Sequence, residues 1–272
     1  MKKIIISGSF ANIKSSDVRF LQEASKLGEL TLLLWSDILC EKLEGKKPGF
    51  PQIERKYFLE SVRYVSQVIV IDHLANRDEL PQINGMDPGI WAILEREDNP
   101  NKHNYCSKNG IQLSIITEDS LKSFPIIPFS PNSISSNVRV MVTGSFDWLH
   151  TGHIRFFEET SELGDLYVVV GHDQNLQLLK GDGHPLFPEQ ERLYMVQSIR
   201  FVKQALISTG HGWMDAEPEF NLIQPDIYVV NEDGDVPEKR QFCQEHNLQY
   251  KVLKRTPKPG LAARQSTTLR GF

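Results

Sequence analysis

The stretch Val142 to Phe156 reads V-T-G-S-F-D-W-L-H-T-G-H-I-R-F and decides the fold of the chain around it. An apolar run, residues 138–142, leads into it and ends at Gly144, and a helical pattern of apolar residues begins just after Gly152. This order predicts a β-strand, a tight turn and the first turn of a helix. Glycine lets the backbone approach a ligand closely, and a helix N-terminus attracts an anion. The stretch therefore predicts a phosphate-binding site.

Two histidines, His150 and His153, lie three residues apart across the predicted helix start. At this spacing both side chains can face a bound anion. Transfer of a phosphoryl or nucleotidyl group needs positioning and stabilisation of charge on the phosphate oxygens, which two imidazoles can supply. The pattern thus indicates transfer at phosphorus without a covalent nucleophile on the protein. The alternative for each histidine is an ordinary turn residue that is solvated or satisfied structurally.

The segment G-S-F-D-W-L-H-T-G-H, residues 144–153, resembles the H-x-G-H signature of the cytidylyltransferase-like nucleotidyltransferases. The stretch K-G-x-x-x-P-L-F-P-E-Q-E-R, residues 180–192, is similar to the phosphoethanolamine and phosphocholine cytidylyltransferases. The resemblance implies catalytic roles for His150, His153 and Lys180. It implies nucleotide binding by a larger set: Thr143, Gly144, Ser145, Phe146, Asp147, Gly152, Arg192, Asp233, Arg255, Ser266, Thr267 and Thr268.

Like the histidines, Lys180, Arg192 and the C-terminal residues Ser266, Thr267 and Thr268 have structural alternatives, which for the last three is a frayed polar C-terminus. Lys180 is either a phosphate ligand or a solvated loop lysine. Arg192 is either a phosphate ligand or a member of a structural ion pair, because Arg55 occupies the same place in the first half of the chain.

The two halves of the chain are similar to each other. Residues 5–20, I-I-S-G-S-F-A-N-I-K-S-S-D-V-R-F, align without gaps with residues 141–156. Lys14 and Asp17 stand where the second half has His150 and His153, and an aspartate would repel a triphosphate. We therefore expect a degenerate, non-catalytic domain at 1–119, a linker rich in proline and serine at 120–137, and a catalytic domain at 138–272.

Each half alternates apolar runs with helical patterns, which predicts an α/β fold with a parallel sheet. The expected architecture is two tandem Rossmann-like, doubly wound domains of the nucleotidyltransferase type. In such sheets ligands bind beyond the carboxyl ends of the strands, where the strand order reverses.

Composition narrows the range of partners. The 272 residues are 40% hydrophobic and 24% charged, with a net charge of -5 and no basic stripe, so a nucleic-acid partner is not expected. The three cysteines have no metal-ligand spacing, and the N-terminal apolar run is too short for a signal peptide. No stretch approaches the roughly 18 apolar residues of a membrane span. These features predict a cytoplasmic protein.

The resemblance implies a cytidylyltransferase. A phosphorylated alcohol or sugar would attack the α-phosphorus of CTP and release pyrophosphate, with Mg²⁺ held mainly through the nucleotide phosphates. The C-terminal R-T and S-T-T, at 255–256 and 266–268, lie between the cytidylyltransferase pattern and that of adenylyltransferases, so ATP is the alternative donor. A non-catalytic nucleotide sensor is the alternative of another class. The tandem halves are expected to form an internal pseudo-dimer within a homodimer.

Overall fold

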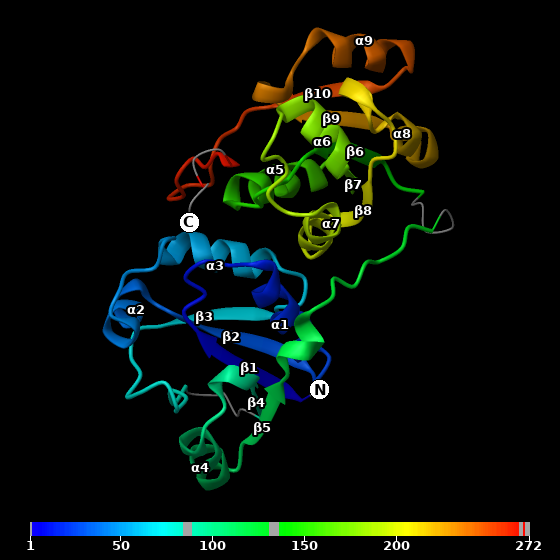
Figure 1. Cartoon of the computed structure of the whole chain (residues 1–272). Helices are drawn as coiled ribbons and strands as arrows, with labels where there is room; N and C mark the ends of the chain where they lie inside the picture. Colours follow the sequence, from blue (N-terminus) through cyan, green and yellow to red (C-terminus); the bar gives the residue numbers. More distant parts are fainter. Residues whose placement is uncertain (1, 84–88, 131–135, 267–268, 270–272) are drawn as a thin grey trace. The chain divides into compact units, whose positions relative to one another are not determined.

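The computed structural model describes residues 2–83, 89–130, 136–266 and 269. The chain divides after Phe124 into two compact units (Figure 1). Both are α/β, and each contains a five-stranded sheet in which every neighbouring pair is parallel. The predicted fold class is therefore confirmed.

The first unit alternates strands and helices along the chain. Its strands are β1 (Lys3–Gly8), β2 (Glu29–Trp35), β3 (Gln67–Ile71), β4 (Ile90–Leu94) and β5 (Gln112–Ile116). Its helices are α1 (Ser15–Ser25), α2 (Asp37–Glu44), α3 (Gln52–Ser61) and α4 (Pro100–Asn109), with the short 3₁₀ helices η1 (Glu95–Glu97) and η2 (Glu118–Leu121). The strands lie in the order β3-β2-β1-β4-β5.

The second unit has the same alternation. Its strands are β6 (Arg139–Gly144), β7 (Asp165–Val170), β8 (Val202–Ile207), β9 (Ile227–Asn231) and β10 (Gln249–Leu253). Its helices are α5 (Thr151–Ser161), α6 (Asp173–Lys180), α7 (Glu189–Gln197), α8 (Glu217–Ile223) and α9 (Pro237–Glu245), with 3₁₀ turns η4 (Gly212–Met214) and η5 (Glu232–Gly234).

The strand order of the second unit, β8-β7-β6-β9-β10, corresponds strand by strand to that of the first. The chain proceeds outward from β6 through β7 to β8 and then returns to the other side of β6 with β9. The strand order therefore reverses between β6 and β9, whose carboxyl ends flank the crevice in which such sheets bind ligands.

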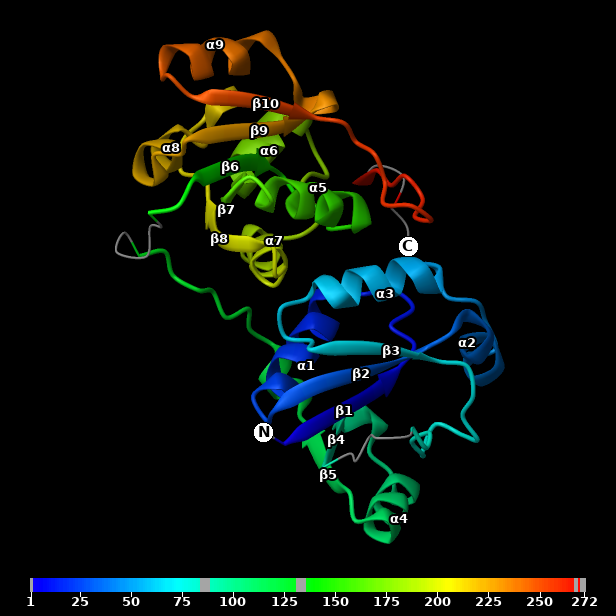
Figure 2. The same cartoon turned by 180° about the vertical axis from the view of Figure 1, so that it is seen from behind.

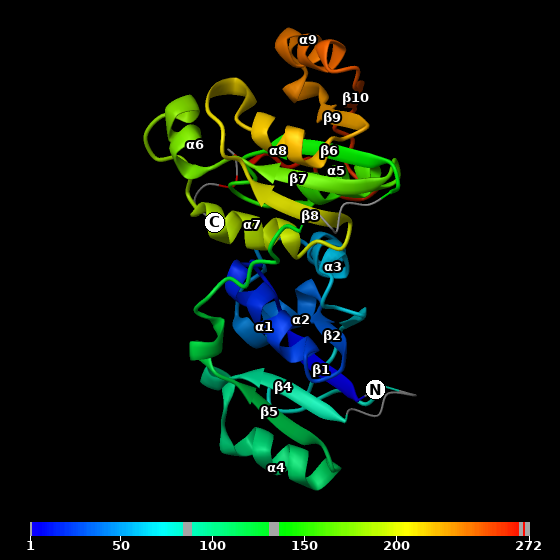
Figure 3. The same ribbon diagram turned by 90° about the vertical axis from the view of Figure 1, so that its right-hand side faces the viewer.

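Helices cover both faces of the second sheet (Figure 3). On one face Met141, Tyr167 and Tyr228 pack against α8 and α9 through Phe220 and Phe242, all of them buried. On the other face α5 and α7 contact β7 and β8. Because both faces are covered, the central strands β6, β7 and β9 carry uninterrupted apolar runs, as buried parallel strands usually do.

The segment between the units packs in part on the second one. Ile127 donates its backbone N–H to the Gln197 side chain at 3.0 Å, and its carbonyl accepts from the same amide at 3.0 Å. Phe129 packs against the core described above. Within the described ranges, no helix combines the length and the apolar character needed to cross a bilayer.

Candidate functional site

The turn between β6 and α5 is tightly packed. Helix α5 begins at Thr151, so it starts before Gly152 and not just after it, as the sequence pattern had predicted. The reason is that His150 serves as the N-cap: its Nδ1 accepts the backbone N–H of Gly152 at 3.1 Å. Phe146, at the centre of the turn, has a left-handed backbone with φ of 48°. Such a conformation is strained for a bulky residue and is often found at functional sites.

The two predicted histidines lie together. The rings of His150 and His153 are stacked, with centroids 4.0 Å apart and an interplanar angle of 23°. The edge-to-face contact of Phe146 with His153, at 5.3 Å, supports the pair from the other side. The His153 ring therefore contacts both His150 and Phe146.

Both imidazoles are neutral. Burial, together with the positive charges of Arg255 and Arg264, lowers the pKa of His150 to about 3. Burial and the neighbouring His150 hold the pKa of His153 well below its usual range. Since Nδ1 of His150 accepts a hydrogen bond, the proton of its neutral ring must be on Nε2.

Each imidazole also has a nitrogen without a partner among the described residues. Within those ranges, Nε2 of His150 and Nδ1 of His153 are buried and accept or donate no hydrogen bond, and the same is true of the Thr151 hydroxyl. Unsatisfied buried polar atoms are rare and require an explanation. A phosphate oxygen at the start of α5 would accept from Nε2–H of His150 and from the Thr151 hydroxyl.

Lys180 lies at the end of α6, beside the same turn. Its Nζ donates to the Ser145 hydroxyl at 2.8 Å, and its charge contributes to the lowered pKa of His153. The predicted lysine and the predicted histidines are therefore neighbours in space.

Arg192 has a structural role in the described contacts. Its guanidinium is buried and donates to the carbonyls of Phe187 and Ser145, at 2.9 and 2.6 Å, and to the carboxylate of Asp173 at 2.7 Å. Arg55 of the first unit makes the matching set with Phe50, Ser9 and Asp37. These contacts match the structural ion pair that the sequence analysis gave as the alternative to a phosphate ligand.

A cavity of about 250 Å³ opens at the reversal point of the sheet. Its wall includes Thr151 and Gly152 at the start of α5, Asn231 and Glu232 at the carboxyl end of β9, and residues 254–258 and 261–265 after β10. The segment after β10 runs back past α5 (Figure 2), which closes this side of the cavity. The salt bridge between Lys258 and Glu158 of α5, at 2.7 Å, ties the segment to that helix.

Arg255 is the predicted residue that organises this segment. It pairs with the carboxylate of Asp233 and donates to the Arg264 carbonyl at 3.1 Å. Asp233 is thus placed to orient Arg255. Ser266 lies at the end of the segment, where its carbonyl accepts from the N–H of Leu269 at 3.2 Å. Thr267 and Thr268 lie outside the described residues.

Several predicted nucleotide ligands have partners within the protein. The Thr143 hydroxyl bonds the buried Tyr228 hydroxyl at 2.7 Å. Asp147 accepts backbone N–H groups from the loop before α7. At Gly144 a Cβ would lie 2.9 Å from the Phe146 ring, so the glycine is required by the turn itself.

Neither the hydrogen bond of Tyr228 nor the Lys258 salt bridge with Glu158 was predicted from the sequence. Tyrosine on a buried strand resembles any core residue, and a lysine and a glutamate 100 positions apart carry no pairing signal in one sequence. Over the described ranges, no group of three or more histidine, cysteine, aspartate or glutamate side chains is arranged to hold a metal ion.

Comparison with known proteins agrees with this geometry. A family model described as "Cytidylyltransferase-like" matches residues 141–252. The FAD synthase of Methanoculleus marisnigri is 36% identical over 132 residues, which are 47% of this chain and 85% of that protein. The chain belongs to the cytidylyltransferase-like family. The FAD synthase of Aciduliprofundum boonei is 38% identical over 120 residues, 43% of this chain and 77% of that protein.

Family membership rests on the second unit, because the matched residues lie there. Among solved structures, the lipopolysaccharide core biosynthesis protein from Thermoplasma volcanium is 29% identical and aligns with 45% of this chain and 99% of its own, with a TM-score of 0.38. The recognition of a cytidylyltransferase-like nucleotidyltransferase from the H-x-G-H signature is confirmed. FAD synthases are adenylyltransferases, so the choice of CTP over ATP as donor is not confirmed.

Proposed function

We propose that the second unit is an adenylyltransferase that transfers AMP from ATP to a small phosphorylated acceptor and releases pyrophosphate. The observation that carries the proposal is the stacked pair of imidazoles, His150 and His153, each with a buried nitrogen that has no hydrogen-bond partner among the described residues. ATP is preferred to CTP because the relatives that the chain matches over most of their length are FAD synthases.

In the proposed reaction, an acceptor phosphate oxygen attacks the α-phosphorus of ATP, and the bond from the α-phosphorus to the bridging oxygen of the β-phosphate breaks. Negative charge grows on the phosphate oxygens in the transition state. His150 donates from Nε2–H to one of these oxygens, and its hydrogen bond with Gly152 keeps it in the required tautomer. Donors that the protein holds in place stabilise the transition-state charge better than water molecules do, because they need not reorient during the reaction.

Lys180 supplies positive charge beside the turn. Its ammonium already lies beside Ser145, and it reaches a phosphate oxygen by exchanging that hydroxyl for the ligand. The backbone N–H groups at the start of α5 add the favourable field of a helix N-terminus. In this proposal Arg192 acts as a positioning residue, because its guanidinium is engaged by the backbone of the turn.

The nucleoside is proposed to occupy the cavity between α5 and the segment after β10. This cavity adjoins Gly152, so a base and ribose placed there would lead the phosphates to the helix start. Arg255 and Ser266 are proposed to contact the outer phosphates. Because the described residues contain no cluster of metal-ligating side chains, a Mg²⁺ ion would take its oxygen ligands mainly from the nucleotide phosphates, where it neutralises charge.

The first unit is proposed to be non-catalytic. Its α1 begins with the same kind of turn, with Phe10 at φ of 46°, but the Asp17 carboxylate occupies the helix start and accepts the backbone N–H of Lys14 at 2.8 Å. A carboxylate in this position already uses the favourable field of the helix and would repel phosphate.

Cytidylyl transfer from CTP is the second candidate, favoured by the Arg255-Thr256 pair in the cavity wall. Pyrophosphate release separates the two. The full chain is incubated with Mg²⁺, each nucleoside triphosphate in turn, and FMN, glycerol 3-phosphate, ethanolamine phosphate or heptose 1-phosphate. We expect pyrophosphate release with ATP and one of the acceptors. Pyrophosphate release only with CTP would instead support cytidylyl transfer. Nucleotide binding without release under any condition would favour a sensor.

A further inference from the structure

Asp147 does not face the cavity. It is only 7% exposed, and it is not among the described residues that line the cavity wall. Its Oδ1 accepts the backbone N–H groups of Leu186 and Phe187, at 2.7 and 3.1 Å. One carboxylate oxygen therefore holds two successive amides of the loop that connects α6 to α7.

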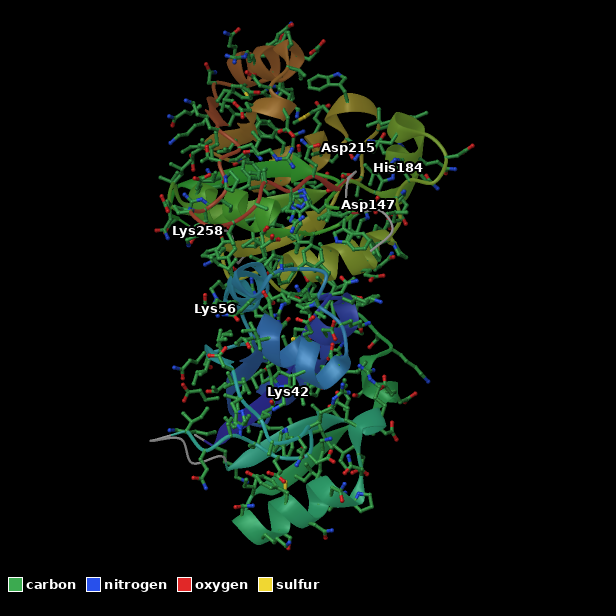
Figure 4. The ribbon with its side chains drawn as sticks, turned by 90° about the vertical axis from the view of Figure 1, so that its left-hand side faces the viewer. Lys42, Lys56, Asp147, His184, Asp215 and Lys258 are labelled. Atoms are coloured by element: carbon green, nitrogen blue, oxygen red, sulfur yellow. The ribbon has the colours of Figure 1, made fainter. Side chains whose placement is uncertain are left out.

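Two further contacts join the same turn to the same loop. Oδ2 of Asp147 lies 3.7 Å from Nδ1 of His184, and both residues are labelled in Figure 4. The ring of Trp148 meets that of Phe187 edge to face, with centroids 5.5 Å apart. Asp147 and Trp148 thus bind one face of the loop, residues 181–187, to the turn at residues 144–148.

The loop is held at both of its ends. It begins at Gly181, directly after Lys180, whose ammonium contacts Ser145. It ends before α7, where Arg192 donates to the carbonyls of both Phe187 and Ser145. The position of Lys180 relative to the two histidines is therefore determined by how the loop sits on the turn.

We propose that Asp147 is a positioning residue for nucleotidyl transfer. Its carboxylate holds the loop at 181–187 against the turn and so keeps the ammonium of Lys180 beside His153. This inference rests on the proposed function, and it assigns Asp147 a role other than direct contact with nucleotide. The first unit has Ala11 at the aligned position, so the sequence offers no such anchor there.

Two substitutions separate hydrogen-bond acceptance from charge. Asp147→Asn keeps an oxygen that can accept both N–H groups and removes the charge, whereas Asp147→Ala removes both. Hydrogen bonds to a neutral oxygen are roughly half as strong, so Asp147→Asn should retain kcat within about fivefold of the unmodified chain. Asp147→Ala should lower kcat about 10²-fold, because displacement of a catalytic group by about 1 Å has an effect of that size.

The matched control is Asp226, which accepts the backbone N–H of Arg139 at 2.8 Å at the start of β6, the end of the strand opposite the turn. Asp226→Asn and Asp226→Ala make the same chemical changes at a carboxylate that accepts one backbone amide. Both should leave kcat unchanged. Thermal unfolding of all four variants identifies any that lose the fold.

Amide hydrogen exchange of the full chain without nucleotide tests the contact independently of turnover. The amides of Leu186 and Phe187 should stay protected in Asp147→Asn and exchange faster in Asp147→Ala. Unchanged protection of these amides in Asp147→Ala would overturn the proposal. Equal losses of kcat in both variants, with the amides still protected in Asp147→Asn, would also overturn it, because the charge of Asp147 and not its hydrogen bonds would then determine the activity. Absence of pyrophosphate release by the unmodified chain would overturn the proposed function and the positioning role together, and the exchange data would still report whether Asp147 anchors the loop.

Discussion

Replacement of Gly152 by alanine should separate activity from stability. The N–H of Gly152 donates to Nδ1 of His150, and a Cβ at residue 152 would lie 2.9 Å from Cε1 and 3.0 Å from Nδ1 of that ring. Carbon atoms pack favourably at about 3.5–4.0 Å, so the ring must move by roughly 0.5–1 Å. The displaced atom is on a side chain, so the backbone of the turn can remain in place.

Displacement of His150 moves the Nε2–H that we propose to contact the phosphate. The expected loss in kcat is about 10²- to 10³-fold, the range seen when one preorganised donor is removed. Stability should change little. Alanine is favoured over glycine in a helix by about 1 kcal/mol, and a ring pushed from its rotamer costs about 0.5–1.5 kcal/mol. The free energy of unfolding should therefore stay within about 1 kcal/mol of the unmodified chain.

Pyrophosphate release and urea unfolding, measured on Gly152→Ala, check both halves of this prediction. Ser16 stands at the aligned position of α1, and Ser16→Ala is the matched control, with unchanged activity expected. A Gly152→Ala enzyme with nearly full kcat would refute the role of His150, since its ring cannot stay where it is beside the added methyl group.

Three further predictions concern charge. Burial lowers the pKa of His150 from 6.5 to about 3, so between these pH values the unfolded chain binds a proton at this residue and the folded chain does not. The contribution of His150 to the free energy of unfolding is therefore complete above pH 6.5 and falls by about 3 kcal/mol between pH 7 and pH 4. Urea unfolding at both pH values should show this component in the unmodified chain and not in His150→Gln, and an equal pH dependence would contradict it. Arg192→Lys should lower the free energy of unfolding by about 2–5 kcal/mol, and Arg55→Lys should act similarly on the first unit, because each buried guanidinium satisfies backbone carbonyls; losses below about 1 kcal/mol in urea titrations would argue against this role. Asp17→Asn should leave pyrophosphate release unchanged within about twofold, because the first unit lacks the histidine pair; a large drop would give that unit a part in catalysis.

The periodicity of apolar residues and the positions of the glycines were sufficient to predict most of the fold. The apolar run before Gly144 and the helical pattern after it correspond to β6 and α5, and the alternation of elements predicts the parallel sheets that are observed. The start of α5 was misplaced because histidine is an uncommon N-cap. A cap made by the ring nitrogen of His150 is visible only once the backbone is built.

The candidate site was predictable where it depends on residues close in the sequence. His150 and His153 are three positions apart, so the helix itself brings them together. The contacts of Asp147 could not be predicted from the sequence, because its partners are backbone N–H groups 39 and 40 positions away. Every residue except proline has such an N–H group, so the residues at these positions carry no signature of the contact. The alternatives for Arg192 likewise depended on contacts that one sequence does not reveal.

In the proposed reaction the α-phosphorus moves from ATP to the acceptor, and labelled ATP shows whether it does. The full chain is incubated with Mg²⁺, the acceptor that supports pyrophosphate release, and ATP labelled at either the α- or the γ-phosphorus. We expect the α-label to enter the acceptor product, the γ-label to leave in pyrophosphate, and His153→Ala to abolish both. Appearance of γ-label in the product, or full transfer by His153→Ala, would contradict this expectation.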